Sequence, residues 1–355
     1  MNQPRHLQRD DRRAPRPPQS LAPRRSGALL RAIATAGLLA LLAVLGSSLA
    51  VAAEEGERPA QSAKPALLSA YLGPGCKGRE RVEGFEQWAG RKLDRTLDFL
   101  AVNSWREMES AASWAGKCWS DWGDRWIVSV PMLAKDGQSN LPACARGDYD
   151  EHMRTIASRL VAGGHGASIV RLGWEFNANW FPWSSVKDPK SYVACWRRWV
   201  GVMREVPDTR FRFDWTPILG VGVVSPEPAY PGDDVVDIIG ADVYNVNYFP
   251  AGVPPAARWQ AMRDAPFGLQ WHRKFAKAHD KPMSYPEWGT GTRPDGHGGG
   301  DDPVFMAGMV HWISINRVEY HSYWDYGARD YNATLSTGKQ PKSGELFQRG
   351  FGSTR

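Results

Sequence analysis

Residues 168–183, SIVRLGWEFNANWFPW, combine the two features that decide the fold. Their first half is a short apolar run with a single arginine in it, which is typical of a strand buried on both faces of a parallel sheet. The run ends at Glu175, and an aromatic-rich segment follows. Runs of the same kind recur along the chain, and together they occupy residues 68–72, 96–102, 126–133, 168–172, 211–218, 235–243, 282–285 and 319–324.

Helix-like segments alternate with these apolar runs, at residues 149–161, 191–206, 257–278 and 303–315. Strands that alternate with helices predict an α/β protein with a parallel sheet. Eight such units fit a (β/α)8 TIM barrel better than an open doubly wound sheet. No G-x-G-x-x-G motif follows a strand and no P-loop is present, so we expect no nucleotide site. We expect residues 66–355 to form a single catalytic domain.

Two glutamates stand where such a barrel carries its chemistry. Glu175 ends the fourth run, and Glu287 ends the seventh within residues 281–289, KPMSYPEWG. Catalytic residues of this fold lie at the C-terminal ends of strands. Two carboxylates suit glycosidic cleavage, because one protonates the leaving oxygen while the other attacks the anomeric carbon or activates water. The pair therefore predicts a glycoside hydrolase.

The aromatic content favours a sugar ligand. All 17 tryptophans follow residue 65, and many fall in segments expected at the C-terminal face of the barrel. An indole offers a large apolar face together with one polar N–H, which suits the C–H face and the hydroxyls of a sugar ring. The cluster at residues 180–183, WFPW, lies directly beyond Glu175 and is the hardest to explain as packing.

At these segments the sequence is similar to a known family. Residues 171–183 resemble the acid/base segment of glycoside hydrolase family 26, the β-mannanase family of the retaining (β/α)8 clan, and residues 281–289 resemble its nucleophile segment. Residues 230–244 look like its sixth strand and residues 323–325 like its eighth. The resemblance implies a secreted retaining enzyme that cleaves internal β-glycosidic bonds of a polysaccharide, with no cofactor and no metal.

Position within the resemblance also implies roles. Glu175 would be the acid/base and Glu287 the nucleophile, with their carboxyl groups roughly 5–5.5 Å apart as in retaining enzymes. Arg171 and Tyr244 would orient Glu287, and Trp180 and Trp324 would stack on sugar rings. The full set of predicted substrate-binding residues is Arg171, Trp174, Asn179, Trp180, Trp183, Tyr244, Trp288 and Trp324.

One residue departs from the family pattern. Mannanases of the family usually carry His immediately before the acid/base, whereas this chain has Trp174. Tryptophan offers only an N–H and a large apolar face, so we expect Trp174 to influence which sugar is accepted. Other β-glycans, or an exopolysaccharide of the same cell, stay open as substrates. A non-catalytic glycan-binding or polysaccharide-export protein on the same barrel and a transglycosylase stay open as functions.

The N-terminus accounts for the net charge of +6. Residues 1–31 hold eight Arg against two Asp, so the rest of the chain is neutral, which argues against electrostatic binding of nucleic acid. Residues 1–53 run from basic to apolar to small, as an export signal does, and an uncleaved anchor is the alternative. Residues 54–65 are expected to form a linker. We expect a secreted or periplasmic monomer whose partner is its polysaccharide substrate, without stable membrane association.

The four cysteines, Cys76, Cys118, Cys144 and Cys195, match neither a zinc site nor a C-x-x-C redox motif. In an oxidising compartment they predict two disulfides with three possible pairings, and buried free thiols are the alternative. In a barrel, Cys76 and Cys118 follow the first two strands and would share the C-terminal face. That placement favours a bridge between them and leaves Cys144 and Cys195 as the other pair.

Overall fold

The computed structural model describes residues 65–352. The predicted export signal, residues 1–53, and all but the last residue of the predicted linker, residues 54–65, lie outside the described residues. Within the described part, no helix has both the length and the apolar character needed to cross a bilayer.

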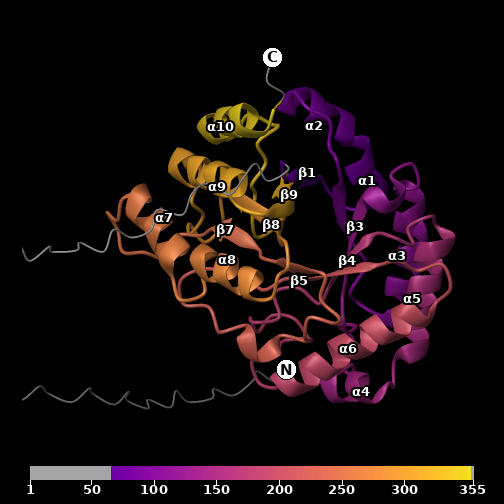
Figure 1. Cartoon of the computed structure of the whole chain (residues 1–355). Helices are drawn as coiled ribbons and strands as arrows, with labels where there is room; N and C mark the ends of the chain where they lie inside the picture. The colour runs from indigo at the N-terminus through magenta and orange to yellow at the C-terminus, as the bar shows by residue number, and fades with distance from the viewer. Residues whose placement is uncertain (1–64, 353–355) are drawn as a thin grey trace, which may run out of the picture. The chain divides into compact units, whose positions relative to one another are not determined.

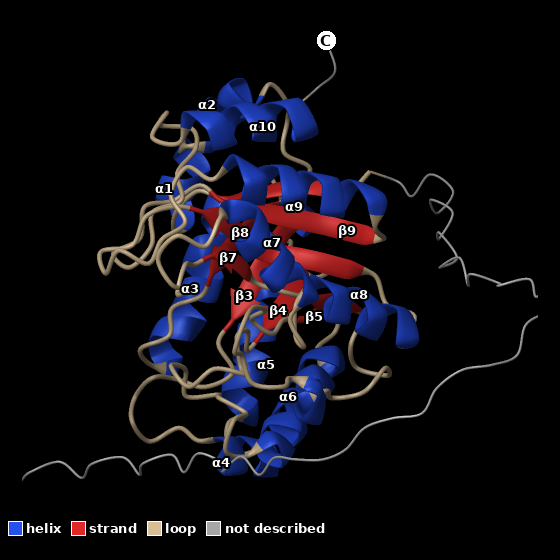
Figure 2. Cartoon of the chain, turned by 90° about the vertical axis from the view of Figure 1, so that its left-hand side faces the viewer, coloured by secondary structure: helices blue, strands red, loops and turns tan. Residues whose placement is uncertain are grey.

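A parallel β-barrel forms the centre of this domain, and helices cover it from outside (Figures 1 and 2). The hydrogen-bonded order is β1-β9-β8-β6-β5-β4-β3-β2, and β7 pairs with β8. Because β6 and β7 share one position, the described strands fill eight positions, and the predicted TIM barrel is confirmed. The strands are β1 (Leu67–Tyr71), β2 (Thr96–Phe99), β3 (Trp126–Val130), β4 (Ile169–Leu172), β5 (Arg212–Trp215), β6 (Ile238–Gly240), β7 (Val243–Asn245), β8 (Met283–Thr290) and β9 (Val318–Trp324).

Side chains of alternate strand positions fill the barrel. A compact cluster of buried residues drawn from six strands lies inside it, namely Tyr71, Leu97, Ile127, Ile169, Ile238 and Tyr320. The larger apolar core lies between the strands and the surrounding helices. Each predicted apolar run overlaps a strand at one of the eight positions of the barrel. The agreement is expected, because a strand covered on both faces needs apolar residues on both.

The helices follow the strands in the expected order: α1 (Gly75–Glu80), α2 (Val82–Ala89), α3 (Trp105–Cys118), α4 (Leu141–Arg146), α5 (Asp150–Ala162), α6 (Pro189–Glu205), α7 (Pro255–Asp264), α8 (Leu269–Ala278), α9 (Pro303–Ile315) and α10 (Pro341–Phe351). Two short 3-10 turns, Gly123–Arg125 and Glu227–Ala229, complete the set in the described part. Three of the four predicted helices are confirmed, as α5, α6 and α9.

The single helix predicted over residues 257–278 is wrong. The segment forms two helices, α7 and α8, because Pro266 lacks an N–H and disfavours helical backbone at Ala265, which is extended with φ −53° and ψ 154°. Helix α3 was not predicted, although Ser104 accepts a hydrogen bond from the Glu107 N–H, the Ser-x-x-Glu arrangement that often begins a helix.

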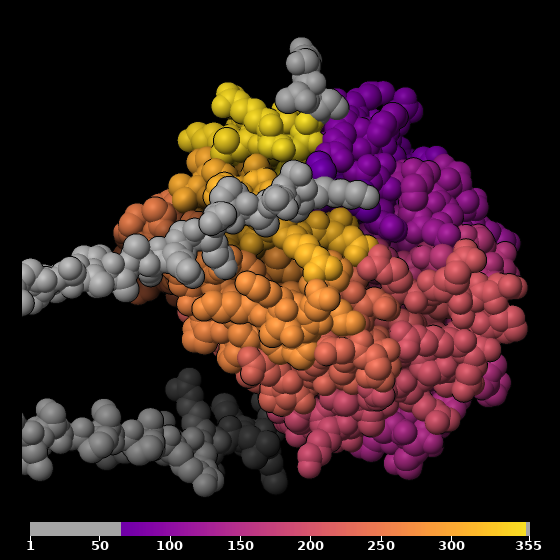
Figure 3. Space-filling view, viewed as in Figure 1, coloured from indigo at the N-terminus to yellow at the C-terminus, as the bar shows by residue number. Residues whose placement is uncertain are grey.

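One seam of the barrel has no strand ladder. The hydrogen-bonded order of the described strands begins at β1 and ends at β2, and side chains and loops join these two strands instead. The Leu68 N–H donates to Asp94 Oδ2 at 2.8 Å, and the Asp94 N–H donates back to the Leu68 carbonyl at 2.9 Å. The last described helix, α10, packs against α2 near the start of the described chain. Gln348 of α10 donates to the Trp88 carbonyl of α2, and Figure 3 shows the two segments side by side.

The predicted disulfides are both present, in the favoured pairing. Cys76–Cys118 joins α1 to α3, and Cys144–Cys195 joins α4 to α6. The first bridge connects the segments that follow β1 and β2, so it closes the seam that lacks a ladder.

Removing the first bridge by replacing Cys76 and Cys118 with Ser should lower the free energy of unfolding by about 2–4 kcal/mol, because the bridge restrains a long loop of the unfolded chain. The Cys144→Ser/Cys195→Ser variant is the matched control, since the loops span 42 and 51 residues and predict similar losses. Only the first pair of substitutions should also lower the glycoside hydrolase activity that the sequence predicts, because only that bridge spans the seam. Urea unfolding and rates on polysaccharide check this, and equal loss of activity in both variants would contradict it.

Candidate functional site

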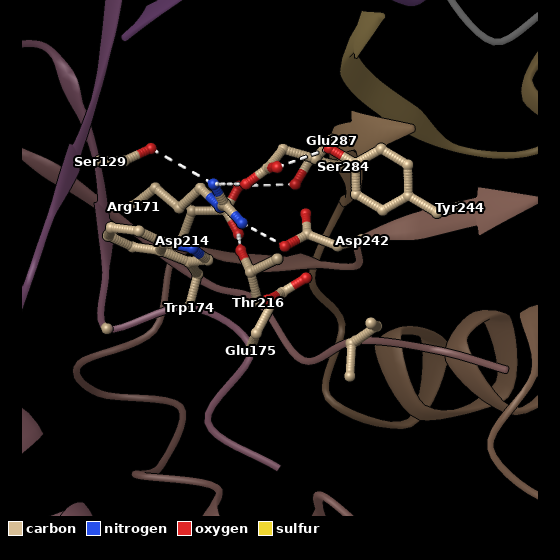
Figure 4. Close-up of polar contacts among 12 residues, drawn as sticks. Ser129, Arg171, Trp174, Glu175, Asp214, Thr216, Asp242, Tyr244, Ser284 and Glu287 are labelled. Carbon is tan, nitrogen blue, oxygen red and sulfur yellow. Dashed lines mark hydrogen bonds and ion pairs between the residues drawn. The ribbon is translucent and has the colours of Figure 1, made fainter. Parts of the chain in front are cut away.

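Four strands bring the predicted site residues together at the C-terminal end of the barrel. Arg171 lies in β4 and Glu175 three residues beyond it, Tyr244 lies in β7, Glu287 in β8 and Trp324 at the end of β9. Figure 4 shows the arginine extended between Asp242 and Glu287, with the Tyr244 hydroxyl directed at the same glutamate.

Donors occupy both oxygens of the Glu287 carboxylate. Arg171 Nη1 donates to Glu287 Oε1 at 2.5 Å, and the Tyr244 hydroxyl donates to Oε2 at 2.7 Å. Glu287 is only 6% exposed and Arg171 is fully buried, so little solvent screens this ion pair. Burial raises the pKa of Tyr244 well above its ordinary value, and the adjacent Glu287 adds to the effect, so the phenol keeps its proton and remains a donor. The arrangement holds Glu287 as an oriented anion.

A β-bulge turns Glu287 into the barrel. The pairing of β8 with β9 shifts register between Tyr285 and Trp288, and Pro286 in this interval has no N–H to donate to a ladder. Ser284, before the bulge, points inward and donates to Asp214 Oδ2 at 2.5 Å, whereas Tyr285 points outward and accepts from Trp312 of α9 at 2.6 Å. The extra residue reverses the alternation, so that Glu287 points inward.

The chain turns sharply after β4 to place Glu175. Gly173 and Glu175 both have positive φ, 52° and 51°, and a Cβ at Gly173 would lie 2.3 Å from the sulfur of Met132. A left-handed glutamate costs of order 1–3 kcal/mol, and such strain clusters at functional sites. The Glu175 N–H donates to the Thr216 carbonyl at 2.8 Å, which ties the turn to the end of β5.

The surroundings of Glu175 favour its neutral form. Burial raises the pKa of its carboxyl to about 8, with the Glu287 carboxylate as the second cause. Arg171 and the Trp180 indole oppose the rise, and Trp180 Nε1 donates to Glu175 Oε2 at 2.8 Å. At neutral pH Glu175 therefore carries a proton while its neighbour Glu287 is held as an anion.

Sequence reasoning missed Asp242, which accepts a hydrogen bond from Arg171 Nη2 in a fully buried ion pair. It lies between β6 and β7, and burial raises the pKa of its carboxyl well above the ordinary value, against the effect of Arg171. Ser129 of β3 was also missed, and its hydroxyl accepts from Arg171 at 3.3 Å. The detectable signal for Asp242 was a carboxylate two residues before Tyr244 that follows the apolar residues 238–241.

Three of the predicted aromatic residues contact the residues that surround the two glutamates. Trp180 is 49% exposed and bonded to Glu175. Trp324 is partly buried and stacks on Tyr71 with a centroid distance of 4.3 Å. Trp174 is only 7% exposed, with its ring 5.1 Å from the Arg171 guanidinium, so it packs under the site and offers no broad open face.

Two further predicted aromatic residues lie away from the glutamates. Trp288 is fully buried outside the barrel, where it donates to His321 Nδ1 at 3.2 Å and packs against Phe347 of α10. The bulge that turns Glu287 inward also turns Trp288 outward. Trp183 is fully buried and donates to the Trp174 carbonyl at 2.7 Å, so it holds the loop after β4 in place.

Asn179 is exposed next to Trp180, and both line a hollow of about 480 Å³ that residues of the loop after β3, such as Lys135 and Ser139, close from the other side. Among residues 65–352 there is no cluster of three or more His, Cys, Asp or Glu side chains placed to hold a metal ion.

Comparison with known proteins supports the family resemblance. The model of glycosyl hydrolase family 26 matches residues 165–253, which contain Glu175 and Tyr244. No curated protein sequence matches the chain. The family resemblance is thereby confirmed over this segment.

Solved structures of low sequence identity share the fold. A modular endo-β-1,4-mannanase from Cellulomonas fimi aligns with a TM-score of 0.58 at 17% identity, over 79% of this chain and 71% of that one. A family 26 β-mannanase from Bacteroides ovatus gives 0.56 at 17% identity, over 81% and 88%. The catalytic domain of an endo-β-1,4-mannanase from Bacillus sp. JAMB-750 gives 0.57 at 16% identity, over 82% and 88%.

Proposed function

We propose, from the premise that this chain is a glycoside hydrolase with a family 26 segment, that it is a retaining enzyme cleaving internal β-glycosidic bonds of a β-mannan-like glycan. The observation that carries the proposal is the contrast between two neighbouring carboxyl groups. Arg171 and Tyr244 hold Glu287 as an anion, while burial keeps the proton on Glu175 at neutral pH. Environments that separate the protonation states of a carboxyl pair assign an acid and a nucleophile.

In the first step, Glu175 donates its proton to the glycosidic oxygen while Glu287 Oε attacks the anomeric carbon. The carbon–oxygen bond breaks, the leaving chain departs as an alcohol, and the retained sugar is bound to Glu287 as an ester. In the second step, the Glu175 carboxylate takes a proton from water, whose oxygen attacks the anomeric carbon and releases Glu287. Two inversions give a product with the original β configuration.

The charge of Glu287 changes during this cycle, and the change suits the two roles of Glu175. Arg171 faces Asp242 and Glu287 together, and the Glu287 carboxylate raises the pKa of Glu175. When Glu287 loses its charge in the ester, the repulsion that raises the pKa of Glu175 disappears. Glu175 then ionises more readily, as its second role as a base requires.

The aromatic residues around the site and the structural neighbours support the proposed substrate. Trp180 and Trp324 provide aromatic surfaces beside the glutamates, and three structural neighbours are described as β-mannanases. Trp174 replaces a polar side chain at the floor, so we include related neutral β-glycans. The two disulfides suit an oxidising compartment, and we propose export with a mature chain that starts near Ala53.

A substrate panel tests the proposal. Purified enzyme is incubated with β-1,4-mannan, xylan and mixed-linkage β-glucan, and released reducing ends and product lengths are followed. We expect oligosaccharides of several lengths from mannan or a related β-glycan, with the β anomer appearing first by NMR. If none of the glycans is cleaved, the proposed activity is contradicted. Initial release of the α anomer contradicts the retaining mechanism.

A further inference from the structure

A second hollow, of about 540 Å³, lies at the seam between β1 and β2 and shares no lining residue with the hollow beside Trp180. Its lining is mostly apolar and includes Phe99, Val102, Ala111 and Trp114. Its volume falls within the ~300–1,000 Å³ typical of ligand sites. Trp114 of α3 is 54% exposed there, which is unusual for the largest apolar side chain.

The Trp114 ring rests on backbone that only glycine allows. A Cβ at Gly75 would lie 2.2 Å from the indole, and Gly75 has a φ of +53°. The adjacent Cys76 is bridged to Cys118, one helical turn beyond Trp114. Buried Asp98 accepts from the Gly75 N–H at 2.7 Å and from Trp119 Nε1 at 2.8 Å. These links fix the loop after β1 to α3, so the exposed indole is held in place before any ligand arrives.

Phe99 lies between this hollow and the residues around the two glutamates. The Phe99 ring lines the hollow and meets Trp174 with a centroid distance of 5.1 Å. It also lies 5.7 Å from the guanidinium of Arg171, which holds Glu287. Trp180, bonded to Glu175, lines the separate hollow described above. The leaving chain belongs on the side of the proton donor Glu175, so the hollow at Phe99 receives the part of the glycan that stays bound to Glu287.

We propose that Trp114 is a sugar-stacking residue of a remote subsite, which binds a neutral pyranose of the retained chain beyond the sugar that reacts with Glu287. This inference rests on the proposed function and adds a residue that determines the preference for long chains. The apolar lining suits the C–H face of a pyranose, and Asn103, Glu107 and Ser110 at the rim offer polar groups for its hydroxyls. The Asn103 amide donates to Glu107 Oε2 at 2.9 Å, which orients that rim.

The test compares two substrates of different length. For Trp114→Ala, we expect the ratio of kcat/KM on β-1,4-mannan to kcat/KM on 2,4-dinitrophenyl β-mannoside to fall about tenfold, because loss of an aromatic contact of this size weakens only the longer substrate. Trp114→Phe should recover most of the ratio. Ile315→Ala, which truncates a comparably exposed apolar residue at the end of α9, is the control for general surface effects.

An unchanged ratio in Trp114→Ala, or an equal loss on both substrates, would overturn the proposal, since the second result means that Trp114 acts through the fold. Retardation of the protein in gels that contain mannan separates this inference from the proposed function. Retardation that weakens in Trp114→Ala supports the subsite even if no glycan is cleaved, and retardation that is equal in both proteins refutes it.

Discussion

Replacing Glu287 by Ala is expected to lower the rate on polysaccharide roughly 10⁴–10⁶-fold, the range seen when a covalent nucleophile is removed. The loss is large because no other carboxylate replaces Glu287 beneath the anomeric carbon. Asp242 is held by Arg171 on the far side of the guanidinium, and Glu175 is the proton donor. Residual hydrolysis without added anion should be close to background.

Small anions provide the diagnostic measurement for this variant. In Glu287→Ala, azide can enter the vacated space and attack an activated aryl β-glycoside from the face that the carboxylate used. The single displacement should give an α-glycosyl azide, inverted relative to the substrate, and NMR of the product reads the configuration. Near-normal hydrolysis of polysaccharide by Glu287→Ala without azide would contradict the retaining mechanism.

Stability controls separate chemistry from folding in this experiment. The substitution leaves Arg171 paired with Asp242, so the buried guanidinium keeps an anionic partner. Glu287→Gln is the closer control, because its amide oxygen can accept from Arg171 while its amide nitrogen donates to the Tyr244 hydroxyl. Both variants should unfold at urea concentrations close to that of the unchanged protein, while both lose activity.

Local patterns in the sequence were sufficient for the barrel and for its two glutamates. Runs such as residues 168–172 need apolar side chains on both faces, and a glutamate at the end of such a run has few structural reasons to be there. The division of residues 257–278 into two helices was also readable from Pro266. These features depend on neighbours in sequence, which is why a single chain reveals them.

Features that depend on pairing between distant strands were not predictable. Trp288 was expected in the site because it directly follows Glu287 in a segment at the C-terminal face of the barrel, and strict alternation in β8 would place it on the same face as Ser284. The bulge between Tyr285 and Trp288 reverses that alternation, and it is recognised only from the pairing of β8 with β9. Asp242 acquires its role only because β4 brings Arg171 beside it. The side of the barrel on which a residue lies was therefore harder to predict than the strand that carries it.

Removing the carboxyl of Glu175 is expected to slow polysaccharide cleavage about 10²–10⁴-fold, the usual contribution of a general acid and base. The loss should depend on the leaving group, unlike the loss in Glu287→Ala. An aryl glycoside with a strongly activated leaving group needs no proton, so Glu175→Ala should form the ester on Glu287 readily and then accumulate it. Azide should release that ester as a β-glycosyl azide, with retained configuration.

The pH dependence provides an independent measurement of the same residue. Glu175 is needed in its protonated form, and its pKa is raised to about 8, so kcat/KM on polysaccharide should fall as pH rises through about 8. The Trp180 indole stabilises the charged form of Glu175, so Trp180→Phe should move this alkaline limb to higher pH. Trp183→Phe, in the same loop, alters a tryptophan that donates to a backbone carbonyl and should leave the limb in place.

The direction of this shift separates two explanations of the Trp180 contact. If the indole serves only as a surface for sugar, Trp180→Phe changes KM and leaves the limb where it was. If the hydrogen bond to Glu175 tunes the acid, the variant gains activity relative to the unchanged protein above pH 8 even where its affinity is lower. A limb that moves to lower pH would contradict both the assignment of Glu175 as the acid and the cause given for its raised pKa, because loss of a donor to a carboxylate can only favour the protonated form.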